Sequence, residues 1–208
     1  LVELEVRAGL TVLTGETGAG KSIVVDALLL TVFALHHSAF AREPIKKRLA
    51  SLVPTTLLRS VYVWVASCLL ILMDYLWEPV GGILYRVDGW PAWIFAIVQI
   101  TGVGMIVQSV RAIDPLELGG IRNPKMTDDE LQTGGDYRIV RHPLYFGWFL
   151  IVFGAAHMTG DRLTFAVLTT TYLVIAMPWE ERSLERTFGA SYRQYKQQVR
   201  WRIVPYLY

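Results

Sequence analysis

The stretch SVYVWVASCLLILMDYLW, residues 60–77, decides the class of fold. Its apolar residues followed by Asp74 also fit the second acidic motif of an ATPase, in which a metal-binding aspartate follows a buried strand. However, the apolar run begins near Val61 and ends with Tyr75 and Trp77, and such aromatic residues gather at membrane boundaries. A bilayer span needs about 20 residues, with a range of roughly 17–25. We therefore interpret residues 60–77 as a transmembrane helix.

The composition of the whole chain also indicates a membrane protein. The 208 residues are 53% hydrophobic and include seven Trp and ten Tyr, which is more apolar than an ordinary soluble domain. The formal net charge of +2 is too small to indicate a nucleic-acid-binding surface. The single cysteine, Cys68, lies inside an apolar run, so we expect no disulfide framework.

Apolar segments recur along the chain at residues 23–40, 60–77, 91–110, 144–158 and 163–178. The first three are long enough to span a bilayer. The last two are shorter and only residues 159–162 separate them, so we interpret them as a tight helical hairpin. The predicted fold class is all-α, a polytopic transmembrane helical bundle with a C-terminal helical hairpin and an interfacial helix.

The number of basic residues alternates between successive connecting segments. Five Lys or Arg lie in residues 41–59, one in residues 78–90, five in residues 111–143, one in residues 159–162, and six after Pro178. The positive-inside rule places the basic segments in the cytoplasm. We expect an integral protein of the bacterial inner membrane whose C-terminal tail faces the cytoplasm.

A phosphate-binding signature precedes the first apolar segment. GETGAGKS, residues 15–22, satisfies G-x-x-x-x-G-K-[ST], in which backbone N–H groups and Lys21 hold phosphates and Ser22 holds Mg²⁺. Residues 1–30 resemble the start of the recombination protein N family of DNA-repair ATPases. Such a site also needs a parallel sheet and an acidic residue from a second strand.

We expect the remaining chain to supply neither of these parts, so nucleotide hydrolysis is not the predicted function. We interpret residues 1–22 as a P-loop-like N-terminal fragment that stands in place of the first helix of a different protein. Residues 23–208 then form the membrane domain.

Two pairs of charged residues occur in the C-terminal third. GGDYRIVRHPLYFGW, residues 134–148, places Arg141 and His142 directly before a proline, which is favoured in the first turn of a helix. The predicted hairpin returns Glu180 and Glu181 to the same end of the membrane. The two pairs suit a zwitterionic ligand, whose carboxylate meets the basic pair and whose ammonium or hydroxyls meet the acidic pair. A salt-bridge cluster that only anchors two helices explains the spacing equally well.

A short amphipathic helix is predicted after the glutamates. Gly189 ends the preceding helix and Ser191 caps the next one. Tyr192, Tyr195 and Val199 then form an apolar stripe. This helix either anchors the chain at the interface or acts as a lid that excludes water.

Two ordered motifs carry a family resemblance. G-x-Y-x-x-x-R-H-P-x-Y-x-G-W, from Gly135, is followed by E-E-x-x-L-x-x-x-F-G-x-x-Y-x-x-Y-x-x-x-V, from Glu180. The pair resembles the membrane-embedded isoprenylcysteine carboxyl methyltransferase and phospholipid methyltransferase superfamily. Residues 24–208 look most like its bacterial methanethiol S-methyltransferase branch, whose relatives include NnrU-like proteins.

The resemblance implies an S-adenosylmethionine-dependent membrane methyltransferase that acts on a small apolar thiol such as methanethiol. The alternatives are a lipid-amine or isoprenylcysteine carboxyl methyltransferase and a non-catalytic NnrU-like membrane protein. The implied partners are the lipid bilayer and a small apolar or lipid-borne methyl acceptor, without nucleic acid or metal.

Adjacent helical residues point about 100° apart, so His36 and His37 form no chelating pair.

Carried over position by position, the resemblance also implies the residues of the cofactor pocket. They are Tyr137, Arg141, His142, Pro143, Tyr145 and Gly147 on one side, Glu180 and Glu181 on the other, and Tyr192 and Tyr195 at the closing side. A sulfonium already activates its methyl group, so the protein chiefly aligns the nucleophile and excludes water. For a thiol acceptor, His142 is the candidate catalytic residue that takes the proton, with water or hydroxide as the alternative.

Overall fold

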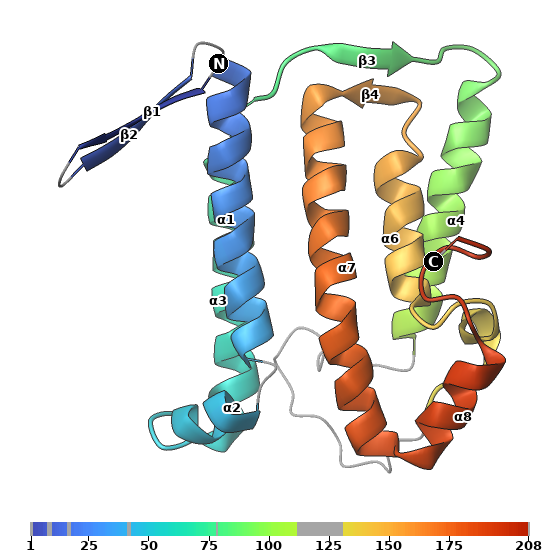
Figure 1. The fold of residues 1–208 in the computed structure, drawn as a ribbon. Coiled ribbons are helices and arrows are strands. Elements are labelled where there is room, and N and C mark those ends of the chain that lie inside the picture. Colours follow the sequence, from blue (N-terminus) through green and yellow to red (C-terminus); the bar gives the residue numbers. More distant parts are fainter. Residues whose placement is uncertain are drawn as a thin grey trace. The chain divides into compact units, whose positions relative to one another are not determined.

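The computed structural model describes residues 2–7, 10–15, 18–40, 43–77, 79–111 and 131–207. The chain divides into two compact units. Figure 1 labels their helices and strands. The first comprises residues 1–84 and 158–168, and the second comprises residues 85–157 and 169–208.

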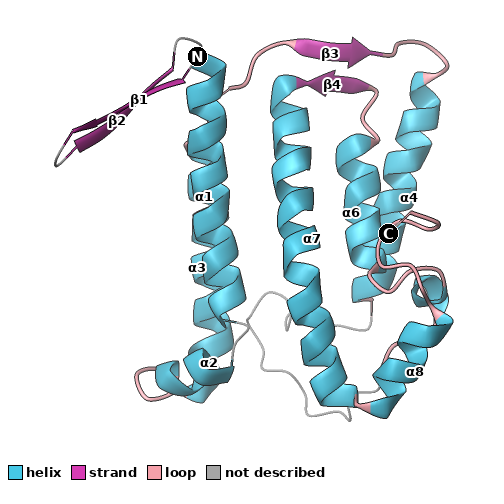
Figure 2. Ribbon diagram, viewed as in Figure 1, coloured by secondary structure: helices cyan, strands magenta, loops and turns pink. Residues whose placement is uncertain are grey.

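Helices dominate the described residues (Figure 2), which confirms the predicted all-α membrane fold. By length and composition, four helices are able to cross a membrane: α1 (Gly18–Phe40), α3 (Thr55–Tyr75), α4 (Ala92–Val110) and α7 (Gly160–Phe188). The shorter elements are α2 (Glu43–Leu49), the 3₁₀ helix η1 (Gly135–Arg138), α6 (Pro143–Phe153) and α8 (Ala190–Gln198).

The first unit begins with a β-hairpin. Strand β1 (Val2–Arg7) pairs antiparallel with β2 (Leu10–Gly15), and the two form a two-stranded sheet by themselves. Within the described residues, therefore, no parallel strand lies beside β2 to support a nucleotide site. Helix α1 runs without interruption across the proposed boundary between residues 22 and 23, and that boundary stays a prediction.

Helices α1 and α3 pack against each other through an aromatic contact. The ring of His36 stacks on that of Tyr62, with centroids 5.6 Å apart, and the Tyr62 hydroxyl hydrogen-bonds His37 Nδ1. The two histidines therefore meet an aromatic neighbour, and the described residues contain no cluster of three or more metal-ligating side chains. Helix α3 confirms the predicted span but begins earlier, at Thr55, and ends at Tyr75.

The start of α7 is fixed to the segment that follows α3. Asp161 Oδ1 accepts hydrogen bonds from the backbone N–H of Val80, at 2.7 Å, and from the indole of Trp77, at 3.2 Å. A Cβ added to Gly160 would lie 2.4 Å from the carbonyl oxygen of Val80, so only glycine allows this approach.

The C-terminal hairpin differs from its prediction at both helices. Helix α6 ends at Phe153, and the short strand β4 (His157–Thr159), which pairs with β3 (Ile83–Arg86), replaces the expected end of the first segment. At about 1.5 Å per residue, α6 is only about 16 Å long, roughly half of a bilayer's hydrocarbon core. Helix α7 is longer than predicted because it continues through Pro178 to Phe188.

In the second unit, α4 and α6 pack closely through glycine. A Cβ added to Gly102 would lie 2.6 Å from the carbonyl oxygen of Gly147, and a Cβ added to Gly147 would lie 2.6 Å from that of Gly102. Gln99 also donates from Nε2 to the carbonyl of Ile151, at 2.9 Å. Small residues let the two backbones approach, as is common between membrane helices.

Candidate functional site

The basic pair lies at the start of α6, where the C-terminal tail holds its backbone. His142 directly precedes the helix and Pro143 is its first residue, as predicted. The backbone N–H of Arg141 donates to the carbonyl of Trp201, and that of His142 to the carbonyl of Arg202, both at 2.9 Å. The tail therefore fixes the position of the basic pair.

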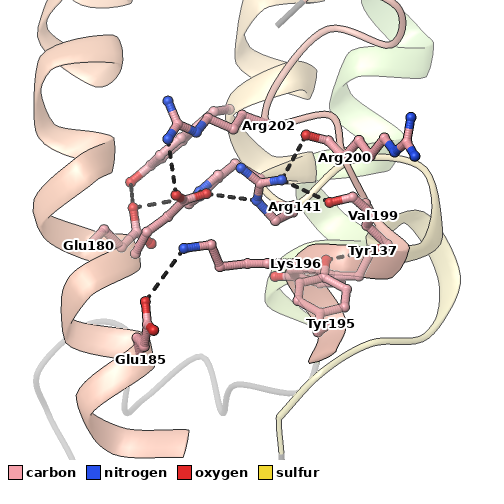
Figure 3. A network of polar contacts seen from close by, with 12 residues as sticks. Tyr137, Arg141, Glu180, Glu185, Tyr195, Lys196, Val199, Arg200 and Arg202 are labelled. Carbon is pink, nitrogen blue, oxygen red and sulfur yellow. Dashed lines mark hydrogen bonds and ion pairs between the residues drawn. The ribbon is translucent and has the colours of Figure 1, made fainter. Parts of the chain in front are cut away.

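The guanidinium of Arg141 is committed to acceptors of the protein itself (Figure 3). Its Nε donates to Glu181 Oε1 at 2.7 Å, and one terminal nitrogen donates to the carbonyls of Val199, at 2.8 Å, and Arg200, at 2.7 Å. The side chains of Arg141 and Glu181 are only 7% and 5% exposed. A buried ion pair needs such additional hydrogen bonds, because each ion has lost its hydration.

Glu181 is also close to two other basic groups. Arg202 lies 3.4 Å from Glu181 Oε2, and His142 Nε2 lies 3.5 Å from Glu181 Oε1. The buried carboxylate therefore faces three basic side chains, which together offset the cost of burying its charge.

Glu180 is the accessible member of the acidic pair. Its side chain is 42% exposed, and its Oε2 accepts a hydrogen bond from the Tyr145 hydroxyl at 2.6 Å. His142 Nδ1 lies 3.7 Å from the same oxygen, and the His142 ring stacks on Tyr145 with an interplanar angle of 3°. Tyr145 and His142 thus hold the Glu180 carboxylate in place. Part of its surface remains open to a ligand.

Helix α8 contributes two buried tyrosines. Tyr192 and Tyr195 form a core cluster with Val199, which confirms the predicted apolar stripe. The Tyr195 hydroxyl donates to the carbonyl of Tyr137 at 2.8 Å, whereas the hydroxyl of Tyr192 has no hydrogen-bond partner in the described structure. Burial raises the pKa of each of these three tyrosines, so all three phenols remain protonated donors at neutral pH.

A glycine joins α7 to α8, and a salt bridge between the two helices lies beside it. Gly189 has φ +56°, which favours glycine, and it ends α7 as predicted. The prediction that Ser191 caps α8 was wrong, because Gly189 occupies the position before the helix. Across the junction, Lys196 Nζ lies 3.4 Å from Glu185 Oε2 (Figure 3).

Comparison with known proteins identifies the family. The family model of phospholipid methyltransferases matches residues 120–191, which contain both charged pairs. Methanethiol S-methyltransferase 2 of Bradyrhizobium diazoefficiens is 33% identical over 190 residues, covering 88% of this chain and 73% of that protein. The chain belongs to the methanethiol S-methyltransferase family.

The chain is also similar to further proteins. The methanethiol S-methyltransferase of Mycobacterium tuberculosis is 32% identical, covering 86% of this chain and 77% of that protein. Nurim of Danio rerio is 33% identical, covering 75% of this chain and 62% of that protein. No solved structure gives a significant match. The chain is therefore an integral membrane methyltransferase.

All the predicted site residues of this methyltransferase lie in the second unit. One of them lies in a helix contact rather than among the charged pairs. Gly147 lies in the contact between α4 and α6, where helix packing accounts for the glycine. The basic and acidic pairs are in direct contact, because His142 lies 3.7 Å from Glu180 and 3.5 Å from Glu181.

Sequence reasoning missed the part that the tail plays in the site. Val199 and Arg200 act through backbone carbonyls, which leave no signal in the identity of a side chain. Arg202 is one of the six basic residues after Pro178, and the sequence alone assigned it only to membrane orientation. The spacing between Arg202 and the glutamates in the sequence did not indicate that Arg202 would lie near Glu181.

Proposed function

We propose that the chain transfers a methyl group from S-adenosylmethionine to a small apolar thiol such as methanethiol. The proposal rests chiefly on the convergence of Arg141 and His142 with Glu180 and Glu181, from the two motifs that carry the family resemblance. The names of the relatives support the choice of acceptor. The basic tail supports a site at the cytoplasmic face of the bacterial inner membrane.

The donors and acceptors around the site fit an amino-acid-bearing nucleoside. Glu180 offers an accessible carboxylate for an ammonium or for ribose hydroxyls. The Tyr192 hydroxyl, in a residue only 1% exposed, is a buried donor that still lacks an acceptor. When bound, S-adenosylmethionine supplies an already activated methyl group.

Arg141 and Glu181 act as positioning residues in this proposal. The guanidinium of Arg141 is already satisfied by Glu181 and two carbonyls, so it fixes α6, α7 and the tail relative to one another. A direct bond from Arg141 to a cofactor carboxylate would have to use the remaining terminal nitrogen. In this proposal Arg141 and Glu181 shape the site, and the cofactor-binding role of Pro143 stays a prediction.

A thiol acceptor has to lose its proton before or during methyl transfer. His142 is the proposed acceptor of this proton, because its buried ring lies between the carboxylates of Glu180 and Glu181, whose negative charges favour the protonated imidazole. With S-adenosylmethionine bound, the thiol sulfur would bond to the methyl carbon while the bond from that carbon to the sulfonium sulfur would break, and two neutral thioethers would result. The bilayer suits both the apolar acceptor and the apolar product.

Methyl transfer to defined acceptors tests the proposed activity. The purified chain in detergent is incubated with methyl-labelled S-adenosylmethionine and, separately, with methanethiol, phosphatidylethanolamine or a prenylated cysteine. We expect label in dimethyl sulfide. Label only in the lipid amine or only in the prenylated cysteine would instead identify the alternative acceptors, and label in none would support a non-catalytic protein.

A pair of glutamate variants tests the position of the site. We expect Glu180→Gln to weaken cofactor binding by about tenfold or more, since a hydrogen bond to a charged partner is worth roughly 1.5–3 kcal/mol. Glu185→Gln is the matched control, because Glu185 lies on the same helix but pairs with Lys196. Equal affinities in the two variants, measured by calorimetry, would place the cofactor elsewhere.

A further inference from the structure

A concave surface lies between the segment before α6 and the C-terminal tail. This hollow, which we call the tail groove, has a volume of about 300 Å³. Its lining includes Arg138, Gln198, Arg200, Trp201 and Tyr206, and none of its described lining residues carries a carboxylate. The tail groove is therefore a cationic and aromatic site outside the two charged pairs.

The two arginines of the tail groove have no acidic partner within the described part of the chain. By contrast, Arg86 pairs with Asp88, Arg141 with Glu181, and Arg193 with Glu185. Guanidinium groups present planar sets of donors that match the oxygens of phosphate. Two uncompensated guanidiniums at one hollow therefore favour an anion with several oxygens.

The aromatic residues of the tail groove are held in a specific arrangement. The rings of Trp201 and Tyr206 lie 5.4 Å apart at 48°. Tyr206 has φ +65° and is the one described residue other than glycine with a positive φ. Such strained conformations concentrate at ligand-binding sites, and tryptophan and tyrosine are enriched at membrane boundaries.

Apolar surface adjoins the charged end of the groove. Ile139 lines the groove and is 51% exposed, and the neighbouring Leu207 is also exposed. A free phosphate would leave these side chains in water, whereas acyl chains would cover them. The combination of arginines and exposed apolar residues therefore favours a lipid over a soluble anion.

We propose that the tail groove binds the phosphodiester headgroup of an anionic phospholipid. The cytoplasmic leaflet attracts basic groups of membrane proteins in the same way. The wall of the groove includes Val199 and Arg200, whose carbonyls accept hydrogen bonds from Arg141, so the bound lipid stabilises the segment that positions the charged pairs. This proposal does not depend on the identity of the methyl acceptor.

Thermal unfolding in nanodiscs tests the proposal. We compare discs of pure phosphatidylcholine with discs that contain phosphatidylglycerol, for the unmodified chain and for the double variant Arg138→Gln/Arg200→Gln. We expect phosphatidylglycerol to raise the unfolding midpoint of the unmodified chain by several degrees and to leave that of the double variant nearly unchanged. Arg193→Gln, which removes an exposed arginine outside the groove, is the matched control and should keep the full shift.

Two further arms make the result decisive. Inorganic phosphate added to the chain in phosphatidylcholine discs should give no comparable shift, and an equal shift would identify a soluble anion instead. Glycine adopts a positive φ without strain, so the variant Tyr206→Gly should fold. Because it lacks the aromatic ring, it should lose the response to phosphatidylglycerol. A full response in both the double variant and Tyr206→Gly would overturn the proposal.

Discussion

At the scale of single residues, the site is a carboxylate pair with divided roles. Glu181 is buried against Arg141, Arg202 and His142, whereas Glu180 is accessible and receives the Tyr145 hydroxyl. Adjacent residues on a helix point in different directions, so one carboxylate faces the interior and the other faces the open side. The first serves the structure, and the second is available to a ligand.

Removal of the buried carboxylate should strongly destabilise the protein. We expect Glu181→Gln to lower the free energy of unfolding by roughly 3–5 kcal/mol, because it leaves the charge of Arg141 buried without a counter-ion. The exposed pair of Glu185 and Arg193 is worth about 0–1 kcal/mol, so Glu185→Gln is the control. Chemical denaturation in detergent micelles measures both, and equal losses would contradict the assigned burial.

The tyrosine contact between α8 and η1 should depend on pH. Burial raises the pKa of Tyr195, so its contribution is complete below the unfolded value of about 10 and is lost as pH rises through the folded value. Tyr195→Phe removes the hydrogen bond to the Tyr137 carbonyl and should cost about 1–2 kcal/mol at neutral pH. The stability of this variant should also fall less steeply above pH 10 than that of the unmodified chain, as followed by thermal unfolding.

At the scale of elements, close glycine packing sets the position of α6. Residues 102 and 147 face each other's backbone, so α4 supports the helix whose start carries the basic pair. The tail supports the same start through backbone hydrogen bonds to Trp201 and Arg202. A short helix that cannot cross the bilayer alone is thus held from two sides.

A glycine pair on α4 offers a matched test of this support. Gly102→Ala should force α4 and α6 apart and cost about 1–3 kcal/mol, because the new methyl group meets the carbonyl of Gly147. Gly104→Ala meets nothing within 4 Å and should be neutral or slightly stabilising, since alanine favours helix. Similar melting temperatures for the two variants would argue against the close approach.

At the scale of the whole molecule, the described residues provide no parallel sheet beside the phosphate-binding signature. The described strand β2 pairs only with β1, in antiparallel register. Methyl transfer should therefore be unaffected by Lys21→Ala, and neither form should hydrolyse ATP. Phosphate release from ATP that disappears in Lys21→Ala would show that the N-terminal fragment is functional.

The sequence by itself determined the membrane class, the helical segments and the charged motifs. Hydropathy and spacing act locally, so the spans near residues 60–77 and 91–110 and the glycine that ends α7 were predictable. The early end of α6 was not, because the pairing of β4 with β3 is a long-range contact, and neither was the continuation of α7 through Pro178.

Only the tertiary structure decided which of the charged residues is buried and which is open. Arg141, Glu181 and the carbonyls of Val199 and Arg200 come from three separate parts of the chain, and their pairing depends on distances that no local pattern encodes. Electrostatic stabilisation depends on the burial and separation of charges rather than on their order in the sequence. For this reason the motif predicted a charged site, whereas the fold assigned the part that each charge plays in it.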